Sequence, residues 1–232
     1  GKDVAIVESN HLGGVCLNWG CITTKALLKN ADVLNIIKNS SKYGIEISDY
    51  QVNWSKVIRR SRDVSKRLSK GIEYLIKKNN IRYIPSTGKI LDKNIVQVTS
   101  SEGKISEIHS KNIIISTGAH SKWFPGMEPD GDRVITSKEA MNQEKQPKSL
   151  VVIGAGAIGV EFAHFYNTFG TEVTVIEALP SILPLEDEDV SLALSNIFKK
   201  RKINILTNTS VTKIDRLKSK VKVHTSDNKV IE

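Results

Sequence analysis

The sequence predicts an α/β fold built on parallel strands, and three observations support this prediction. Short apolar runs alternate with amphipathic helical stretches along much of the chain. A glycine-rich turn, Gly154-Ala155-Gly156-Ala157-Ile158-Gly159, separates one apolar run from the helical stretch that follows it. Two apolar runs end in an acid, at Glu8 and at Glu177. Parallel strands joined by helices produce this pattern.

The chain opens with an apolar run and continues with two long helical patterns. We expect 4–8 to form a buried parallel strand and about 16–39 to form a helix with Leu27, Ala31 and Leu34 on one face. A second amphipathic helix is predicted over 54–79, with lysines and arginines opposite its apolar positions. Those apolar positions are Val57, Val64, Leu68, Ile72 and Leu75.

The apolar period then shortens toward two, which predicts short strands. They are expected at 81–84, 89–91, 95–98 and 105–109, followed by an apolar strand at 111–116. The segment 123–131 is rich in proline and glycine and marks a boundary. Beyond it we expect strands at 150–153, 172–177 and 203–206, with helices after the glycine turn and near 187–200. The predicted domains are 1–125 and 126–232.

Composition indicates a globular chain and excludes several classes of protein. The chain has 232 residues, 39% of them hydrophobic, and a net charge of 34 − 25 = +9. No apolar run approaches the ~20 residues of a membrane span. The positive charges are spread along the chain and aromatic residues are few, so we expect neither a nucleic-acid nor a membrane partner.

The glycine-rich turn has the Gly-x-Gly-x-x-Gly spacing of Rossmann-like dinucleotide-binding folds. We expect Gly154 to allow the tight turn, Gly156 to let a pyrophosphate approach, and Gly159 to let the helix pack on the strand. Glu177 follows Gly159 by 18 residues. Its carboxylate would bind ribose hydroxyls and repel a 2′-phosphate, which favours NAD over NADP. The alternative is a glycine-rich turn without a ligand.

The two cysteines of the chain, Cys16 and Cys21, lie five residues apart. On a regular helix that spacing separates Cα atoms by roughly 8.6 Å, more than the ~4.4–6.8 Å of a disulfide. A bridge would need a distorted first turn, for which Gly20 supplies the backbone freedom. The alternatives are a redox-active disulfide and two separate thiols. The five histidines show no spacing that completes a zinc site, so no metal is expected.

The segment GGVCLNWGCITTKALL at 13–28 closely resembles the redox-active segment of the pyridine nucleotide–disulfide oxidoreductases. The resemblance continues through 87–90, 116–119 and 154–163, and its cysteine segment is most similar to the subgroup that oxidises dihydrolipoamide. Thr23 stands where the family usually has proline, and Val15 stands where many members have threonine. Neither departure removes a reacting group.

The resemblance implies site residues. Cys21 would lie against the flavin and Cys16 would exchange with the substrate dithiol, while Lys25 would pair with Glu161. The residues implied to contact FAD are Glu8, Gly13, Gly14, Cys16, Lys25, Gly88, Thr117, Gly118 and Ala119. Those implied to contact NAD are Gly154, Ala155, Gly156, Ala157, Ile158, Gly159, Glu161, Glu177 and Val211. The alternatives are a solvated helix lysine for Lys25, a core strand residue for Val211 and an ordinary strand-end acid for Glu8.

The resemblance also implies two Rossmann-like domains, one for FAD and one for NAD, both incomplete in this chain. Further segments are expected before Gly1 and after Glu232, so we expect residues 1–232 alone not to turn over. The implied activity is oxidation of protein-bound dihydrolipoamide with reduction of NAD⁺. The implied partners are lipoyl domains of 2-oxoacid dehydrogenase complexes or of the glycine cleavage system, served by a homodimer. The implied location is the bacterial cytoplasm or the mitochondrial matrix.

Two other functions stay open. One is a disulfide reductase similar to the glutathione and mercuric reductases. The other is a nucleotide-binding regulator that keeps the fold without the catalysis.

Overall fold

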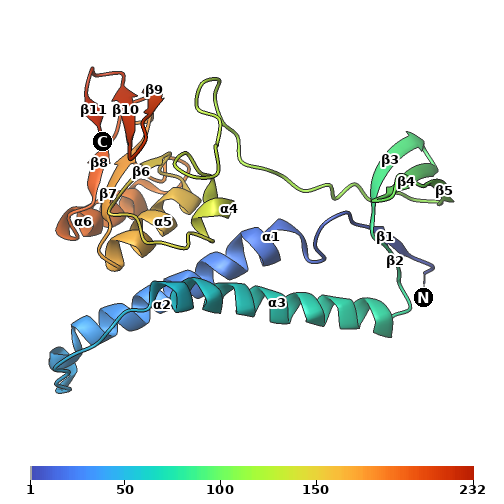
Figure 1. Ribbon diagram of the computed structural model, residues 1–232, viewed down its shortest axis with the longest axis horizontal. Helices are drawn as coiled ribbons and strands as arrows, with labels where there is room; N and C mark the ends of the chain where they lie inside the picture. Colours follow the sequence, from blue (N-terminus) through green and yellow to red (C-terminus); the bar gives the residue numbers. More distant parts are fainter. Residues whose placement is uncertain (1) are drawn as a thin grey trace. The chain divides into compact units, whose positions relative to one another are not determined.

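The computed structural model describes residues 2–232 and divides them into two compact units (Figure 1). Unit 1 contains the residues up to Ile22 together with Arg62–His120, and unit 2 contains Thr23–Ser61 and Ser121–Glu232. The long helices α2 (Cys21–Lys38) and α3 (Trp54–Lys78) contribute residues to both units.

The other elements of unit 1 are β1 (Ala5–Val7), α1 (Gly14–Trp19), β2 (Arg82–Ile84), β3 (Ser86–Asp92), β4 (Ile95–Ser100) and β5 (Ile105–His109). Those of unit 2 are η1 (Ser40–Tyr43), α4 (Ser137–Ala140), β6 (Ser149–Ile153), α5 (Ala157–Thr168), β7 (Glu172–Ile176), α6 (Glu188–Lys200), β8 (Asn204–Leu206), β9 (Val211–Arg216), β10 (Val221–Thr225) and β11 (Val230–Ile231).

The parallel α/β fold is confirmed in unit 2. Strands β6, β7 and β8 form a parallel sheet in that order, and α5 and α6 connect them (Figure 1). This is the order of half a dinucleotide-binding fold. Phe165 and Tyr166 of α5 are fully buried with Val173 and Val175 of β7 in one apolar cluster. Residues 149–206 thus form the strands and helices that their sequence predicts.

The limits of unit 2 differ from the predicted domain limits, because the helical segment 23–61 belongs to it. Leu27 and Ala31 of α2, with Ile58 of α3, lie in the same apolar cluster as the buried residues of α5. The predicted face of α2 is therefore confirmed as buried. The assignment of 1–125 and 126–232 to two cofactors stays a prediction.

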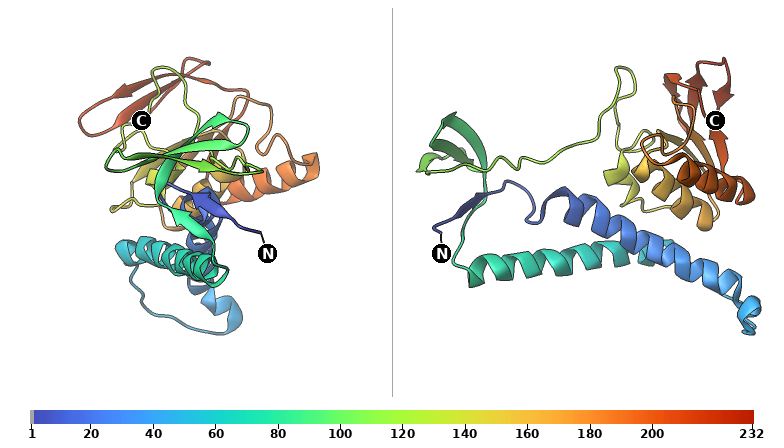
Figure 2. Two further views of the ribbon diagram at one scale, coloured as in Figure 1. Left: turned by 90° about the vertical axis from the view of Figure 1, so that its right-hand side faces the viewer. Right: turned by 180° about the vertical axis from the view of Figure 1, so that it is seen from behind.

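Unit 1 contains two small sheets. β1 pairs with β2 in parallel, as expected, but it is not the buried strand that its apolar sequence predicts, since Ala5 is exposed and Ile6 and Val7 are only half-buried. The reason is that the sheet has two strands within the described residues and leaves an open edge. β3, β4 and β5 form an antiparallel sheet whose strands are joined by turns at 93–94 and 101–102 (Figure 2).

The predicted strand at 111–116 is wrong. No strand is formed there in the described chain, and Ile114 and Ile115 are 89% and 70% exposed. A strand needs a neighbour for its main-chain hydrogen bonds. The described residues supply no such partner to this segment, so its apolar sequence alone does not form a strand.

Helix α3 buries a different line of residues from the one that its apolar pattern predicts. Leu68 and Leu75 are 40% and 49% exposed. The buried positions include Ile58, Ser61, Ser65 and Ile76. The expected face is therefore partly wrong, because serines occupy the buried line and make hydrogen bonds there.

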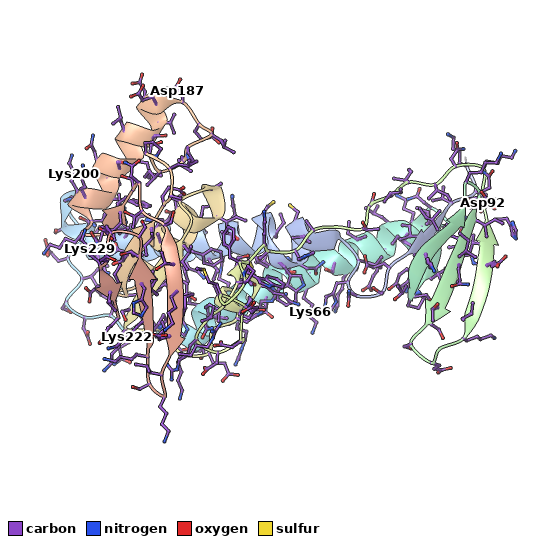
Figure 3. All side chains as sticks on the ribbon, turned by 90° about the horizontal axis from the view of Figure 1, so that it is seen from above. Lys66, Asp92, Asp187, Lys200, Lys222 and Lys229 are labelled. Atoms are coloured by element: carbon purple, nitrogen blue, oxygen red, sulfur yellow. The ribbon has the colours of Figure 1, made fainter. Side chains whose placement is uncertain are left out.

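The last part of the chain forms an antiparallel meander, in the order β11-β10-β9, that the sequence analysis does not anticipate. Figure 3 shows Lys222 and Lys229 on this meander, and Asp187 and Lys200 at the two ends of α6. Asp187 caps the start of α6 by accepting a hydrogen bond from the main-chain nitrogen of Asp189. Acids at the start and lysines at the end of α6 suit the helix dipole.

His164 of α5 lies among polar groups from two other helices. Its Nδ1 atom is 3.2 Å from Nη1 of Arg201, which follows α6. Since a guanidinium only donates, this ring nitrogen accepts and the imidazole is neutral. Burial and the Arg201 charge lower the pKa of His164 from its ordinary value, and the Asp32 charge opposes them.

We expect the stability of the fold to decrease as the pH falls below about 6.5, the ordinary pKa of histidine. There the unfolded chain binds a proton that folded His164 does not bind. His164→Gln should flatten the pH dependence of the unfolding free energy by at most ~1.4 kcal/mol per pH unit. Urea unfolding across this pH range measures it. His109→Gln is the control, since His109 is exposed on β5; equal flattening in both variants would contradict the prediction.

Candidate functional site

The two cysteines lie on different helices, on either side of Gly20. Cys16 is in α1, Cys21 is the first residue of α2, and both are exposed. A Cβ atom at Gly20 would lie 3.1 Å from the Cα atom of Cys16 and from the carbonyl oxygen of Val15. Glycine therefore permits the break between the two helices that a disulfide between Cys16 and Cys21 requires.

Gly13 and Gly118, two of the residues implied to contact FAD, lie beside α1. Gly13, which precedes this helix, has a φ of +98°, a conformation that favours glycine. The Glu8 carboxylate accepts a hydrogen bond of 2.7 Å from the main-chain nitrogen of Asn10. A Cβ atom at Gly118 would lie 3.9 Å from Val15. The structure thus brings the segment 117–119 close to the helix that carries Cys16.

Gly88 and Gly14 are the other glycines implied to contact FAD. A Cβ atom at Gly88 would lie 3.4 Å from Cγ1 of Val7. Gly88 therefore packs closely against the strand that ends at Glu8. Gly14 has no other heavy atom within 4 Å of a Cβ position, so its main chain faces open space.

The glycine-rich turn of unit 2 shows three different environments for its three glycines. Gly154 has a φ of +97° and donates from its main-chain nitrogen to the carbonyl oxygen of Ile176 at 2.8 Å. A Cβ atom at Gly159 would overlap the carbonyl oxygen of Gly154. A Cβ atom at Gly156 would meet nothing within 4 Å. The turn is therefore tight, the helix packs directly on it, and the main chain at Gly156 is open to a ligand.

The start of α5 is suited to an anion. The helix runs for 12 residues from Ala157, and Ile158 in its first turn is 59% exposed. The first N–H groups of a helix have no partner within the helix and carry a partial positive charge. This end of α5, beside the open main chain at Gly156, fits the pyrophosphate of a dinucleotide.

Glu177 is buried and fixes the glycine-rich turn. Oε2 of Glu177 accepts a hydrogen bond from the main-chain nitrogen of Ala155 at 2.7 Å, and Oε1 accepts one from that of Leu179 at 2.9 Å. The carbonyl oxygen of Ala155 accepts a further bond from the main-chain nitrogen of Leu183 at 2.8 Å. Each carboxylate oxygen has a second lone pair, so Glu177 can hold the turn and still accept a ribose hydroxyl.

We expect Glu177→Gln to narrow the preference for NAD⁺ over NADP⁺ by roughly tenfold or more, because the charge that repels a 2′-phosphate is removed. Affinity for both cofactors should also fall, since an amide oxygen can replace one of the two acceptor oxygens but the amide nitrogen cannot replace the other. The measurement is kcat/KM for each cofactor in the full-length protein. Glu172→Gln, an exposed change at the start of β7, is the control. An unchanged ratio in Glu177→Gln would contradict the role of this carboxylate.

Lys25 and Glu161 come together in unit 2. Nζ of Lys25 in α2 lies 2.5 Å from Oε1 of Glu161 in α5, with the two side chains 62% and 24% exposed. An ion pair this exposed contributes only ~0–1 kcal/mol to stability. Its main effect is to hold the lysine amino group in one place.

Val211 is the first residue of β9 and pairs with Thr225. Two residues earlier, the main-chain nitrogen of Thr209 donates to the carbonyl oxygen of Glu177 at 3.0 Å. The segment that leads to Val211 is thus attached to the end of β7.

Comparison with known proteins identifies the family. The family described as pyridine nucleotide-disulphide oxidoreductase matches residues 1–232. The chain belongs to this family. Membership of the pyridine nucleotide-disulphide oxidoreductases implies FAD and NAD as cofactors. The glycine-rich turn, the open main chain at Gly156 and the exposed cysteine pair fit that chemistry.

Relatives within the family have a more specific name. The chain is 43% identical to a dihydrolipoyl dehydrogenase of Zymomonas mobilis, covering 90% of this chain and 45% of that protein. It is 39% identical to a dihydrolipoyl dehydrogenase of Rhizobium etli, covering 99% of this chain and 51% of that protein. The chain therefore spans about half the length of these relatives.

Solved structures of the family have the same fold. LpdA from Mycobacterium tuberculosis matches with a TM-score of 0.92 at 22% identity, over 99% of this chain and 50% of that chain. The HOCl-induced flavoprotein disulfide reductase RclA from Escherichia coli, solved as a Cu(II) complex, matches with a TM-score of 0.82 at 28% identity, over 100% of this chain and 49% of that chain. The α/β fold class of the family member is thus confirmed.

Residues 2–232 contain neither a cluster of metal ligands nor a helix suited to span a membrane. Nowhere in this range do three His, Cys, Asp or Glu side chains come together in a way that could hold a metal ion. Within the same range, no helix combines the length and the apolar character of a membrane span.

Proposed function

We propose that this chain is the part of a dihydrolipoyl dehydrogenase that carries the redox-active cysteines and binds FAD and NAD. The observation that carries the proposal is the pair of exposed cysteines. They lie on two helices that are separated by Gly20. The identity of 43% to a relative with this name supports it. In this proposal 1–125 is the FAD domain and 126–232 is the NAD domain.

The chain's own residues carry the dithiol chemistry. One thiolate of dihydrolipoamide attacks the sulfur of Cys16 in the oxidised pair, which forms a mixed disulfide and releases Cys21 as a thiolate. The second thiolate of the substrate then attacks the substrate sulfur of the mixed disulfide. This releases Cys16 as a thiolate and closes the lipoamide ring. The substrate loses two electrons and two protons, and the cysteine pair gains two electrons. The chemistry that the bound cofactors supply is two-electron transfer by FAD and hydride acceptance by NAD⁺.

Other residues position the cofactors in this proposal. Glu8 would accept hydrogen bonds from the FAD ribose, and the main chain of Gly13 and Gly14 would hold the FAD phosphates. Gly88 and 117–119 complete the FAD contacts. In unit 2 the turn 154–159 holds the NAD pyrophosphate, Glu177 holds its ribose, and Val211 lines the same region. The Glu161 carboxylate fixes the Lys25 amino group, which would contribute to FAD binding.

The partners and the location follow from the proposed activity. We propose that the full-length enzyme is a homodimer that serves lipoyl domains of a 2-oxoacid dehydrogenase complex or of the glycine cleavage system. Its location would be the bacterial cytoplasm or the mitochondrial matrix, since the matched relatives include a mitochondrial enzyme of Schizosaccharomyces pombe.

The test is an assay of the full-length, flavin-loaded protein with dihydrolipoamide and NAD⁺, beside glutathione disulfide and Hg(II) with NADH or NADPH. We expect turnover with dihydrolipoamide and NAD⁺ to exceed the other activities by a wide margin. Thiol alkylation with mass spectrometry should find both cysteines protected in the oxidised protein and both modified after dithiol treatment. Efficient reduction of glutathione disulfide or Hg(II), with no dihydrolipoamide oxidation, would replace the proposal by the reductase alternative.

A further inference from the structure

The segment between the two cysteines is attached to α3 by Arg62. Nη1 of Arg62 donates a hydrogen bond of 2.6 Å to the carbonyl oxygen of Asn18. The guanidinium carbon of Arg62 also lies 4.1 Å from the centroid of the Trp19 ring. Asn18 and Trp19 lie between Cys16 and Cys21. One side chain therefore makes both a charge-assisted hydrogen bond and a cation–π contact with this segment.

The side chain of Asn18 adds four hydrogen bonds to the same arrangement. Nδ2 of Asn18 donates to the carbonyl oxygens of Leu12 and Gly14, each at 3.0 Å. Oδ1 accepts from the hydroxyls of Ser69 at 3.1 Å and Ser65 at 3.4 Å, both on α3. Asn18 is only 6% exposed. The last turn of α1 is thus hydrogen-bonded both to the start of the same helix and to α3. Arg62 adds a hydrogen bond to the last turn through the Asn18 carbonyl.

Arg62 also places a positive charge against the segment that joins the two cysteines. The Asn18 carbonyl belongs to the last turn of α1, where carbonyls lack partners within the helix. Burial lowers the pKa of Arg62 from its ordinary value, which means that water screens its charge less than on an open surface. Asn18 and Trp19 precede Cys21 by three and two residues. A cation held on the segment that joins two cysteines favours the thiolate over the thiol.

We propose that Arg62 is a positioning residue of the cysteine pair, which holds the Asn18–Trp19 segment in place and shifts the thiol–disulfide equilibrium toward the reduced form. The inference rests on the proposed function, because it requires Cys16 and Cys21 to form a disulfide. It concerns a residue of α3 outside the cysteine segment and outside both glycine-rich turns. Arg62 acts through Asn18 and Trp19 and needs no contact with substrate.

The test is equilibration of the full-length, flavin-loaded protein with mixtures of glutathione and glutathione disulfide. Each Cys16–Cys21 disulfide that forms takes two electrons and two protons from the protein dithiol and converts one glutathione disulfide into two glutathione thiols. Alkylation with mass spectrometry gives the oxidised fraction at each ratio. Arg62→Gln should shift the midpoint ratio roughly threefold or more toward the disulfide. Arg62→Lys should shift it less, since lysine keeps the charge and loses the planar contact.

Arg67→Gln is the matched control, because it removes the same charge from an exposed position of the same helix. Its midpoint should equal that of the wild type. If Arg62→Gln fails to fold, Trp19→Phe provides the test and should shift the midpoint in the same direction. Equal midpoints for Arg62→Gln (or Trp19→Phe) and Arg67→Gln would overturn the role of Arg62 alone. A wild-type protein that forms no disulfide at any ratio would overturn the proposed function and this inference together.

Discussion

Replacing Gly159 by alanine should lower the affinity for NAD⁺ by roughly 100-fold or more, because the new methyl group would overlap the carbonyl oxygen of Gly154. The overlap involves main-chain atoms, so rotation of a side chain cannot relieve it. Either α5 moves away from the sheet or the glycine-rich turn changes shape. The measurements are NAD⁺ binding by calorimetry and the thermal unfolding of the full-length protein, which overpacking should also destabilise by ~1–3 kcal/mol.

Gly156→Ala is the matched control for this prediction. A Cβ atom at Gly156 meets no neighbour within 4 Å, so the fold should be as stable as in the wild type. Affinity for NAD⁺ should still fall, because the methyl group would occupy the space where the main chain faces a pyrophosphate. A Cβ atom at Gly71 of α3 also meets nothing within 4 Å. Gly71→Ala should therefore lower neither the stability of the fold nor the affinity for NAD⁺. Wild-type affinity in Gly159→Ala would contradict the placement of NAD on this turn.

Replacing Cys16 by serine should reduce dihydrolipoamide oxidation roughly 1,000-fold or more, because a hydroxyl cannot form the disulfide that accepts the electrons. Cys21→Ser should have the same effect on turnover. Affinity for NAD⁺ should be unchanged in both variants, since the NAD turn lies in unit 2. Steady-state assays of the full-length protein measure turnover, and a separate binding measurement gives the affinity for NAD⁺.

Val15→Thr is the control for the cysteine variants. Val15 precedes Cys16 on α1 and is 45% exposed, and threonine should fit there without loss of activity. Substantial turnover in Cys16→Ser would show that electrons enter the protein by a route that does not use this pair.

The sequence could predict those features in which local chemistry decides the structure. Gly154 and Gly159 are needed by main-chain geometry, and both show the conformation or the close approach that their spacing predicts. The parallel strands of unit 2 likewise follow from apolar runs and glycine turns. The Lys25–Glu161 contact joins residues 136 positions apart, and only resemblance to a family could suggest it.

The features that the sequence could not predict depend on neighbours in space. The apolar run at 111–116 has strand character but lacks a pairing partner in the described chain. Helix α3 buries serines because Asn18 lies opposite them, which no periodicity of α3 reveals. The role of Arg62 depends on the same packing. The meander at the end of the chain had a weak local signal, since Val221, Val223 and Thr225 alternate with polar residues.

The peptide groups around Ala155 are held on both sides, by Glu177 through the nitrogen and by Leu183 through the oxygen. Leu183 keeps a φ of +49°, which is rare for leucine, while it makes this bond. A turn fixed in this way loses little conformational entropy when a dinucleotide binds. If either of these two hydrogen bonds is lost, the turn becomes mobile in the free protein. The dinucleotide must then order the turn when it binds. Variants at these positions should therefore weaken binding through a less favourable entropy, even where every direct contact to the dinucleotide is kept.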